Sequence, residues 1–256
     1  MEALPEARPM ANLLDELERV AGRIRESGLL IRVSGGLAVH HWCPSSSHAP
    51  YRREYADLDL VVSVRVKAAA VDGFMSGLGY VPDREFNALH GQRQLYYDDP
   101  ANARHVDVFV EALRMCHVIR LGPRLELTDV AVNPSDLLLT KLQIVELNQK
   151  DINDVLVLLC DKQLVSRPTE LDPLYLGKVW GSDWPLWRTS RGSLARAAQE
   201  VGGIADPGER DRVVRAIEDM NRLLLDCPKT AKWKLRSIVG DRVRWYDLPE
   251  EIEEEE

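Results

Sequence analysis

Residues 57–62, with the sequence DLDLVV, are the feature that most constrains the fold of this chain. In a β-strand successive side chains point to opposite faces, so Asp57 and Asp59 would share one face while Leu58 and Leu60 enter the core. An unpaired buried charge is costly, and two neighbouring carboxylates repel each other. We therefore expect a strand with one buried face and one acidic face that holds a positively charged group.

The composition is typical of a folded protein of one or two domains. Of the 256 residues, 45% are hydrophobic and 29% are charged, which is enough to build a sizeable core. The chain has no apolar run long enough to span a bilayer, and its acidic N-terminus does not resemble a signal peptide. We therefore expect a cytoplasmic protein that does not interact with membranes.

The charge and the cysteines narrow the class of protein further. A formal net charge of -8 argues against a protein that coats nucleic acid generally, although a local basic patch can still bind a polyanion. The four cysteines contain no CxxC pair, which suits reduced thiols better than a disulfide framework. They are Cys43, Cys116, Cys160 and Cys227.

Hydrophobic periodicity predicts alternating helices and strands in the first half of the chain. In chain order we expect a helix at 13–24, a strand at 29–34 ending in a Gly-Gly turn, a helix at 37–42, a strand at 57–64, a helix at 66–80, and two antiparallel strands at 93–99 and 104–111. Residues 43–54 are expected to form an inserted loop. This order indicates an α+β domain with a mixed central sheet flanked by helices.

From Asn133 onward the sequence has a helical period. We expect one helical segment at 133–165 and further helices near 189–201, 208–226 and 228–239. The last residues are a run of glutamates. The sequence therefore predicts an α+β domain at 1–132, a helical C-terminal domain at 133–246, and an acidic, disordered tail at 247–256.

A third carboxylate follows on a later strand. Asp107 lies in HVDVFVE among alternating apolar residues, and Glu111 falls on the same face as a weaker alternative. Mg²⁺ is held by carboxylate oxygens, and a two-metal site for phosphoryl transfer places its ions about 3.5 to 4 Å apart. The pattern thus indicates magnesium bound by Asp57, Asp59 and Asp107. An Asp-x-Asp pair alone also occurs by chance, since single aspartates often cap loops.

The Gly35-Gly36 turn strengthens the functional interpretation. It follows a strand and opens a helix, a geometry that offers backbone N–H groups to a polyphosphate, and Ser34 can add a hydroxyl. The sequence contains neither the P-loop pattern nor the dinucleotide-binding glycine fingerprint. Those two nucleotide-binding folds are therefore not indicated.

Together these residues resemble the nucleotidyltransferase superfamily that includes DNA polymerase beta. The resembling positions are Gly35, Gly36, Asp57, Asp59 and Asp107. Within the superfamily the chain is most similar to the AbiEii-type toxin-like and minimal nucleotidyltransferases. That similarity rests on an Arg before the acidic pair and on a Leu-rich helix with a Lys, followed by a Lys-Asp-x-x-Asp segment. Here these residues are Arg53, Lys141, Lys150, Asp151 and Asp154.

The resemblance implies a nucleotidyltransferase fold and a Mg²⁺-dependent reaction, with two ions and an NTP as donor. The triphosphate would lie over Ser34, Gly35 and Gly36, with Arg53 and Lys141 as its cationic partners. Asp107 would help to activate the acceptor hydroxyl. For Lys141, a solvated lysine on an amphipathic helix is an equal alternative.

Several rival functions stay open on the sequence alone. The acceptor is a tRNA or a protein if the chain is toxin-like, in which case a cognate antitoxin is a further partner. It is a small molecule if the chain acts like the antibiotic nucleotidyltransferases. A non-catalytic nucleotide-binding module is the rival from another class.

Three other groups of residues are better explained by structure. The spacing of His40, His41, Cys43 and His48 matches no standard zinc site. A basic and aromatic mixture lies in residues 229–246, and we favour a packed helix over an RNA-binding segment there. The tryptophans Trp180, Trp184 and Trp187 are typical of packing between helices or domains.

Overall fold

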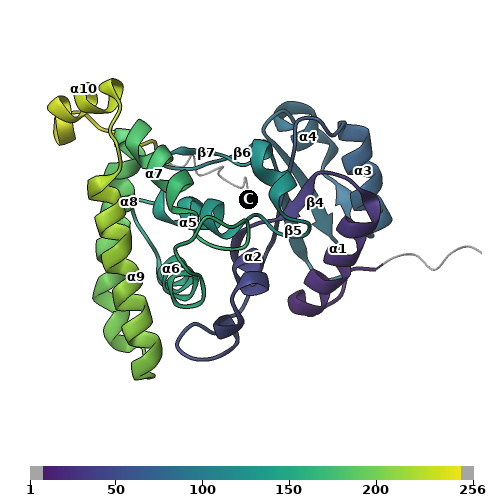
Figure 1. Cartoon of the computed structure of the whole chain (residues 1–256). Helices are drawn as coiled ribbons and strands as arrows, with labels where there is room; N and C mark the ends of the chain where they lie inside the picture. The colour runs from purple at the N-terminus through teal and green to yellow at the C-terminus, as the bar shows by residue number, and fades with distance from the viewer. Residues whose placement is uncertain (1–7, 249–256) are drawn as a thin grey trace, which may run out of the picture. The chain divides into compact units, whose positions relative to one another are not determined.

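The structure is a computed structural model, and it describes residues 8–248. Most of the predicted acidic tail, residues 249–256, lies outside the described residues. The chain forms two compact units, each labelled by its elements in Figure 1. The first contains the described residues to Trp42, Arg53–Leu113 and Arg120–Asn133; the second contains Cys43–Arg52, Arg114–Ile119 and the described residues from Pro134.

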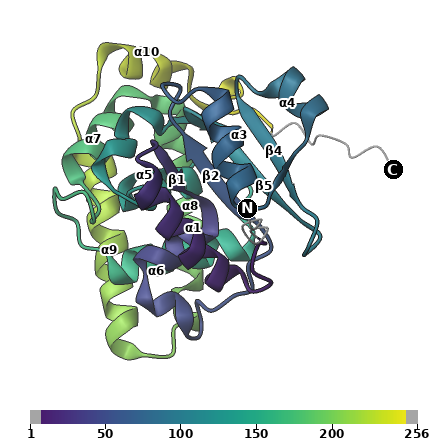
Figure 2. The same cartoon turned by 90° about the vertical axis from the view of Figure 1, so that its right-hand side faces the viewer.

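Within residues 8–248, the first unit contains a five-stranded mixed sheet. Its strands are β1 (Ile31–Val33), β2 (Leu58–Val62), β3 (Val81–Pro82), β4 (Gln94–Asp99) and β5 (Arg104–Val110). They lie in the order β1-β2-β5-β4-β3, with β2 and β5 parallel and all other neighbours antiparallel. Figure 2 shows β2, β5 and β4 side by side. The prediction of an α+β fold with a mixed sheet is confirmed.

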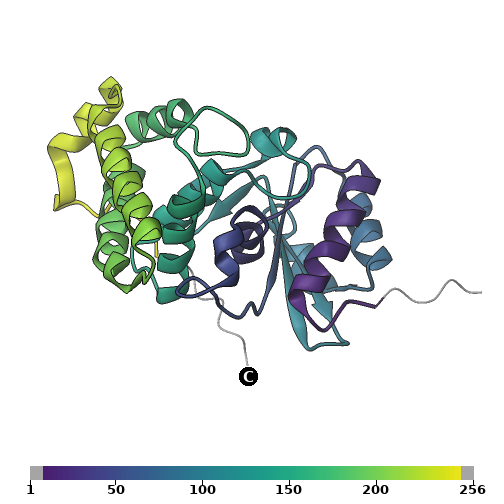
Figure 3. The same ribbon diagram turned by 60° about the horizontal axis from the view of Figure 1, so that its bottom comes forward.

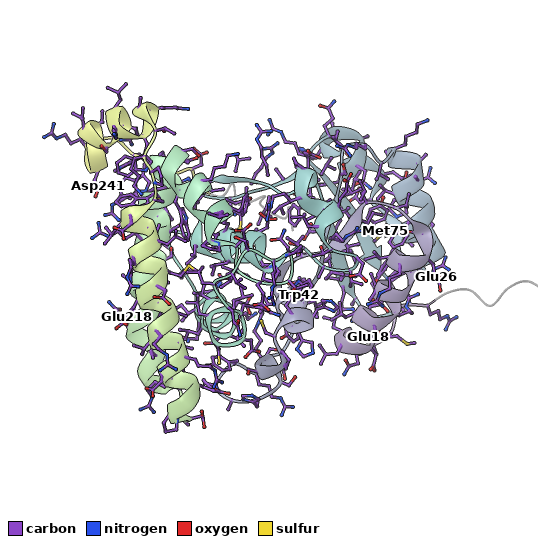
Figure 4. The ribbon with its side chains drawn as sticks, in the orientation of Figure 1. Glu18, Glu26, Trp42, Met75, Glu218 and Asp241 are labelled. Atoms are coloured by element: carbon purple, nitrogen blue, oxygen red, sulfur yellow. The ribbon has the colours of Figure 1, made fainter. Side chains whose placement is uncertain are left out.

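The helices of the first unit pack on both faces of this sheet, and α3 lies against its apolar face. They are α1 (Leu13–Ser27), α2 (Gly35–Trp42), α3 (Ala68–Gly77) and α4 (Arg84–His90). Alternate residues of the strands are buried, and Tyr97 on the buried face of β4 donates its hydroxyl to Asp72 of α3 at 2.6 Å. Met75 of α3, labelled in Figure 4, is fully buried against this core. The sheet therefore has one apolar side, as its alternation predicts.

Local signals explain the bounds of the first helix. Asn12 accepts from the Leu14 backbone N–H at 2.8 Å and so caps the start of α1. Gly28 follows the helix in a left-handed conformation, with φ of 65°, which ends it. Inside the helix Glu16 is fully buried, where it pairs with Arg19 and accepts from the Tyr80 hydroxyl.

The second unit is helical. Its helices are α5 (Pro134–Leu142), α6 (Gln149–Asp161), α7 (Pro173–Ser182), α8 (Trp184–Glu200), α9 (Pro207–Asp226) and α10 (Ala231–Val239). Figure 3 shows α8 and α9 as neighbouring helices in the green part of the chain. The helical period predicted at 133–165 corresponds to two helices, with a break between Leu142 and Gln149. Asn148 then accepts from the Asp151 N–H at 2.9 Å and starts a new helix.

The remaining elements are short. The strands β6 (Ala112–Arg114) and β7 (Val118–Arg120) form a hairpin. Short 3₁₀ turns lie at Pro44–Ser47, Gly122–Leu127, Val201–Gly203 and Gly240–Arg242. None of the helices within residues 8–248 is both long and apolar enough to cross a membrane.

The residues expected to form an inserted loop are anchored within the second unit. Ser45 donates both its backbone N–H and its hydroxyl to Asp161, at 2.9 and 2.7 Å. Tyr51 is buried, whereas Arg53 and Glu54 belong to the first unit. The segment is therefore ordered by its own contacts with α6.

The aromatic residues of the second unit are largely internal. Trp180, Trp184 and Trp187 are buried, and the Arg236 guanidinium lies 4.4 Å from the centre of the Trp184 ring. Asp241, labelled in Figure 4, accepts from Arg188 at 2.9 Å. The packed-helix interpretation of residues 229–246 holds only in part. The Trp233 ring centre lies 5.1 Å from that of Trp187, but α10 has no buried residue, and Leu235 and Ile238 are 67% and 73% exposed.

Candidate active site

Two of the three predicted acidic residues meet at one position of the sheet. Asp59 of β2 and Asp107 of β5 are direct partners in the parallel register. Their strand neighbours Leu58, Leu60 and Val106 are buried, so both carboxylates lie on the opposite, open face. The core residues of the two strands thereby place the acids next to each other.

Asp57 lies just outside the strand that was expected to contain it. β2 begins at Leu58, and Asp57 is an exposed residue of the preceding loop. The negative charge of Asp57 nevertheless raises the pKa of the Asp107 carboxyl group. Asp57 therefore lies near enough to act on Asp107, although it is exposed and outside the strand.

The pKa of the Asp107 carboxyl group is raised by its surroundings. Burial has the largest effect and raises the pKa of Asp107, and the charge of Asp57 also raises this pKa. The hydrogen bond from Gln94 and the charge of His105 lower it. The net result is a pKa above the ordinary value of an aspartate. Gln94 Nε2 donates to Asp107 Oδ1 at 2.6 Å, which fixes the orientation of the carboxylate. A carboxylate with a raised pKa is a better proton acceptor at neutral pH than an ordinary one.

The predicted glycine turn lies directly against this acidic pair. Gly35 has a φ of 60°, and a Cβ atom there would overlap the Asp59 carboxylate. The backbone N–H of the buried Ser34 donates to the Asp59 carbonyl oxygen at 2.8 Å. Glycine is therefore required at position 35 both by the backbone conformation and by the approach of Asp59.

The predicted arginine lies at the same turn. A Cβ atom at Gly36 would overlap the guanidinium group of Arg53, so this cation packs directly against the start of α2. The Arg53 guanidinium also lies 4.8 Å from the centre of the Tyr55 ring. The structure thus brings the turn, the cation and the acids together in the first unit.

Lys141 belongs to the second unit. Its Nζ lies 2.8 Å from Asp151 Oδ1 and 2.9 Å from Asp154 Oδ2. Burial lowers the pKa of Lys141, but the charges of Asp154 and Asp151 and their hydrogen bonds outweigh burial and raise it above the ordinary value. Three residues of the sequence motif therefore form one ion cluster between α5 and α6.

The weaker alternative, Glu111, does not join the acidic pair. It follows the end of β5 with a φ of 68°, and its carboxylate accepts from the Val64 backbone N–H at 3.1 Å. Glu111 therefore stabilises the turn after β2.

The sequence interpretation missed Gln94. It lies on β4 with its side chain on the open face, because Leu95 beside it is buried. The alternation in RQLYYDD carries the signal for this placement, but the pairing of β4 with β5 is needed to assign Gln94 to Asp107.

In their present positions, the described side chains contain no group of three or more His, Cys, Asp or Glu placed to hold a metal ion. The magnesium site at Asp57, Asp59 and Asp107 therefore stays a prediction. His48 Nε2 lies 3.6 Å from Glu209 Oε1.

Comparisons with known proteins add no assignment. No protein-family model matches the chain, and no curated protein matches it either. The resemblance to nucleotidyltransferases is therefore carried by the residues and the geometry described above.

If the chain has the nucleotide-transfer activity that the sequence resemblance implies, a Gly35→Ala variant should lose about a hundredfold of it. The new methyl group would displace the Asp59 carboxylate, and a displacement of about 1 Å at a reacting centre costs a rate loss of this order. Gly22→Ala is the matched control, because a Cβ at Gly22 in α1 meets no atom within 4 Å. Initial rates and melting temperatures of both variants check this prediction. Equal activity in the two would contradict it.

An Asp107→Asn variant should be more stable than the wild type at pH 7. The raised pKa means that the folded protein holds this proton more tightly than the unfolded chain does, so wild-type stability falls as the pH rises through the folded pKa. Asparagine does not titrate and can still accept from Gln94. The gain should vanish below about pH 4, near the ordinary pKa of aspartate. Urea unfolding at several pH values in EDTA measures it, and a less stable variant at pH 7 would be the opposite result.

Proposed function

We propose that this chain is a Mg²⁺-dependent nucleotidyltransferase, with a catalytic domain of the nucleotidyltransferase fold at its first unit. The reaction moves an NMP group from an NTP to an acceptor hydroxyl and releases pyrophosphate. The observation that carries the proposal is the pairing of Asp59 with Asp107, with Gly35 packed against the Asp59 carboxylate.

The acidic residues fit magnesium by their chemistry. All three are carboxylates, the oxygen ligands that Mg²⁺ prefers, and two of them share one face of the sheet at paired positions. The charge of Asp57 acts on Asp107, which a bound cation would offset. Asp57 and Asp59 would hold the ion beside the triphosphate, and Asp107 would share a second one. The bound ions neutralise charge on the phosphates and on the attacking oxygen.

The residues of the first unit have distinct parts in the reaction. The N–H groups of Gly35 and Gly36 bind the triphosphate at the start of α2, and Arg53 neutralises one of its oxygens. Asp107, oriented by Gln94, accepts the proton of the acceptor hydroxyl. The acceptor oxygen forms a bond to the α-phosphorus while the bond from that phosphorus to pyrophosphate breaks.

A labelled-donor assay tests this function. The wild-type protein is incubated with each of the four α-³²P-labelled NTPs, Mg²⁺, and either total RNA or a small-molecule extract. Label should appear in one acceptor fraction with release of pyrophosphate, and EDTA should abolish it. In parallel, Mg²⁺ with the preferred NTP should raise the melting temperature. No transfer and no stabilisation with any NTP would refute the proposal.

A further inference from the structure

Four aromatic rings form a continuous row beside the acidic pair. His105 stacks on Tyr96, with ring centres 4.9 Å apart and planes 27° from parallel. Tyr96 contacts Phe86 at 5.6 Å, and Phe86 contacts His90 at 4.7 Å. We call these four residues the ring row. It runs from β5 across β4 to α4, entirely within the first unit.

The ring row shares the open face of the sheet with the proposed proton acceptor. Tyr96 is the direct partner of Asp107 in the register of β4 and β5. His105 precedes Asp107 by two residues, so its side chain lies roughly 6.5 to 7 Å from that of Asp107 along the strand. The charge of His105 also lowers the pKa of Asp107. His105, where the ring row begins, therefore lies at a distance from the proposed reacting hydroxyl that a single sugar can span.

One ring of the row offers an accessible face. Tyr96 covers one face of the His105 imidazole, yet 52% of the His105 side chain is exposed. An exposure this large leaves the opposite face of the imidazole accessible. Asp98 contacts His105 Nδ1 at 3.0 Å and fixes the rotation of the ring. The imidazole is thus held in a defined orientation without being enclosed.

Asn87 of α4 holds the rest of the ring row in place through hydrogen bonds to the backbone of Tyr96. The side chain of Asn87 donates to the Tyr96 carbonyl oxygen at 3.1 Å and accepts from the Tyr96 N–H at 2.7 Å. These two hydrogen bonds continue the pairing of β4 beyond the short strand β3 and hold α4 in place. Phe86 is thereby packed against Tyr96, and the stack has a fixed base.

The order of the strands places different groups on the two sides of the acidic pair. The phosphate-binding turn follows β1, on one side of the acid-bearing strands β2 and β5, and β4 lies on the other side. The donor triphosphate therefore approaches from the β1 side, and the acceptor from the side of the ring row. An accessible ring face beside an acceptor hydroxyl suits a nucleobase, because every base has a face that stacks on an aromatic ring.

We infer that the acceptor is a nucleoside, whose base stacks on the accessible face of His105 while a ribose hydroxyl lies at Asp107. The inference rests on the proposed function, since it takes Asp107 as the group that receives the acceptor proton. The nucleoside is supplied either by an RNA chain or by a free nucleotide, and the two sources share the same base and hydroxyl.

Fluorescence of 2-aminopurine tests this inference without requiring transfer. The probe is a short RNA with 2-aminopurine at its 3′ end, compared with the same RNA ending in an abasic residue and with free 2-aminopurine riboside. Stacking should quench the probe, and the wild-type protein should bind it about tenfold more tightly than the abasic RNA. Riboside binding equal to that of the RNA would assign the site to free nucleosides.

Substitutions at His105 separate stacking from a structural role. His105→Ala should remove the tenfold preference, whereas His105→Phe should restore it because the ring is retained. His48→Ala is the control, since His48 is also half exposed but belongs to the second unit. Equal binding of base-bearing and abasic RNA by the wild type would overturn the inference. An equal loss of binding to base-bearing RNA and to abasic RNA in His105→Ala would also overturn the inference. Stabilisation by Mg²⁺ with NTP in the same protein would show that the proposed function survives such a failure.

Discussion

An Asp59→Asn variant should lose about a thousandfold or more in nucleotide transfer while it stays folded. Asp59 lies at the centre of the candidate site, paired with Asp107 and packed against Gly35. Asparagine keeps the shape of the side chain but removes a charge that would hold the metal, and the loss of one electrostatic group at a reacting centre has an effect of this size. The stabilisation by Mg²⁺ with NTP should disappear as well.

The matched control for this variant is Asp129→Asn. Asp129 lies in the same unit and pairs with Arg25 at 3.2 Å, but both side chains are exposed, so their ion pair is worth at most about 1 kcal/mol. Labelled transfer and melting curves with and without Mg²⁺ and NTP are measured for both variants. If Asp59→Asn kept the wild-type rate, the site would be assigned wrongly.

A Lys141→Met variant should lose about 3 to 5 kcal/mol in the free energy of unfolding. The Lys141 side chain is only 13% exposed, and it is within 3 Å of both Asp151 and Asp154. Removing it takes the Lys141 cation away from two neighbouring carboxylates, and the loss of one partner from a buried ion cluster has a cost of this size. Lys150→Met, an exposed lysine at the start of α6, should change stability by less than about 0.5 kcal/mol.

Urea unfolding of these variants distinguishes the two roles of Lys141. A triple variant, in which Asp151→Asn and Asp154→Asn accompany Lys141→Met, should recover much of the stability because neutral amides replace the two neighbouring carboxylates. Unchanged stability of Lys141→Met combined with weakened NTP binding would instead favour the phosphate-binding role that the sequence resemblance implies.

Much of the fold follows from local patterns in the sequence. The helix α1, the turn before α2, the strand β2 and the antiparallel pair of β4 and β5 were all expected, because each has a clear hydrophobic period and a turn signal at its ends. The helix α4 was missed because it is short and none of its residues is buried. A segment without an apolar face gives no periodic signal.

The break after α5 shows a second limit. The apolar positions of α5 and α6 continue one helical pattern across the gap, so periodicity alone joins them. The side chain of Gln143 accepts from the His117 backbone N–H at 3.0 Å, and Asn148 caps the next helix. Contacts between residues far apart in sequence decide where such a helix ends.

For the same reason, the candidate site could be predicted only in part from the sequence. Asp59, Asp107 and Gly35 follow from alternation and from a glycine pair, and the structure places them together. The role of Gln94 and the ring row depends on which strands are neighbours, and the order β1-β2-β5-β4-β3 is not encoded locally. The ion cluster of Lys141 likewise needs the packing of α5 against α6.

The parallel pairing of β2 with β5 has a consequence for how the protein becomes active during synthesis. Residues 63–103 separate the two strands in the chain, and they include α3, β3, α4 and β4. A parallel pair separated by such a long segment forms slowly, because the chain must close a long loop before any contact between the strands is made. A nascent chain therefore has no paired acids until β5 has left the ribosome and joined β2. The two acids should thus become paired in a single step, after α3 and α4, which lie between the two strands in the chain, can already form.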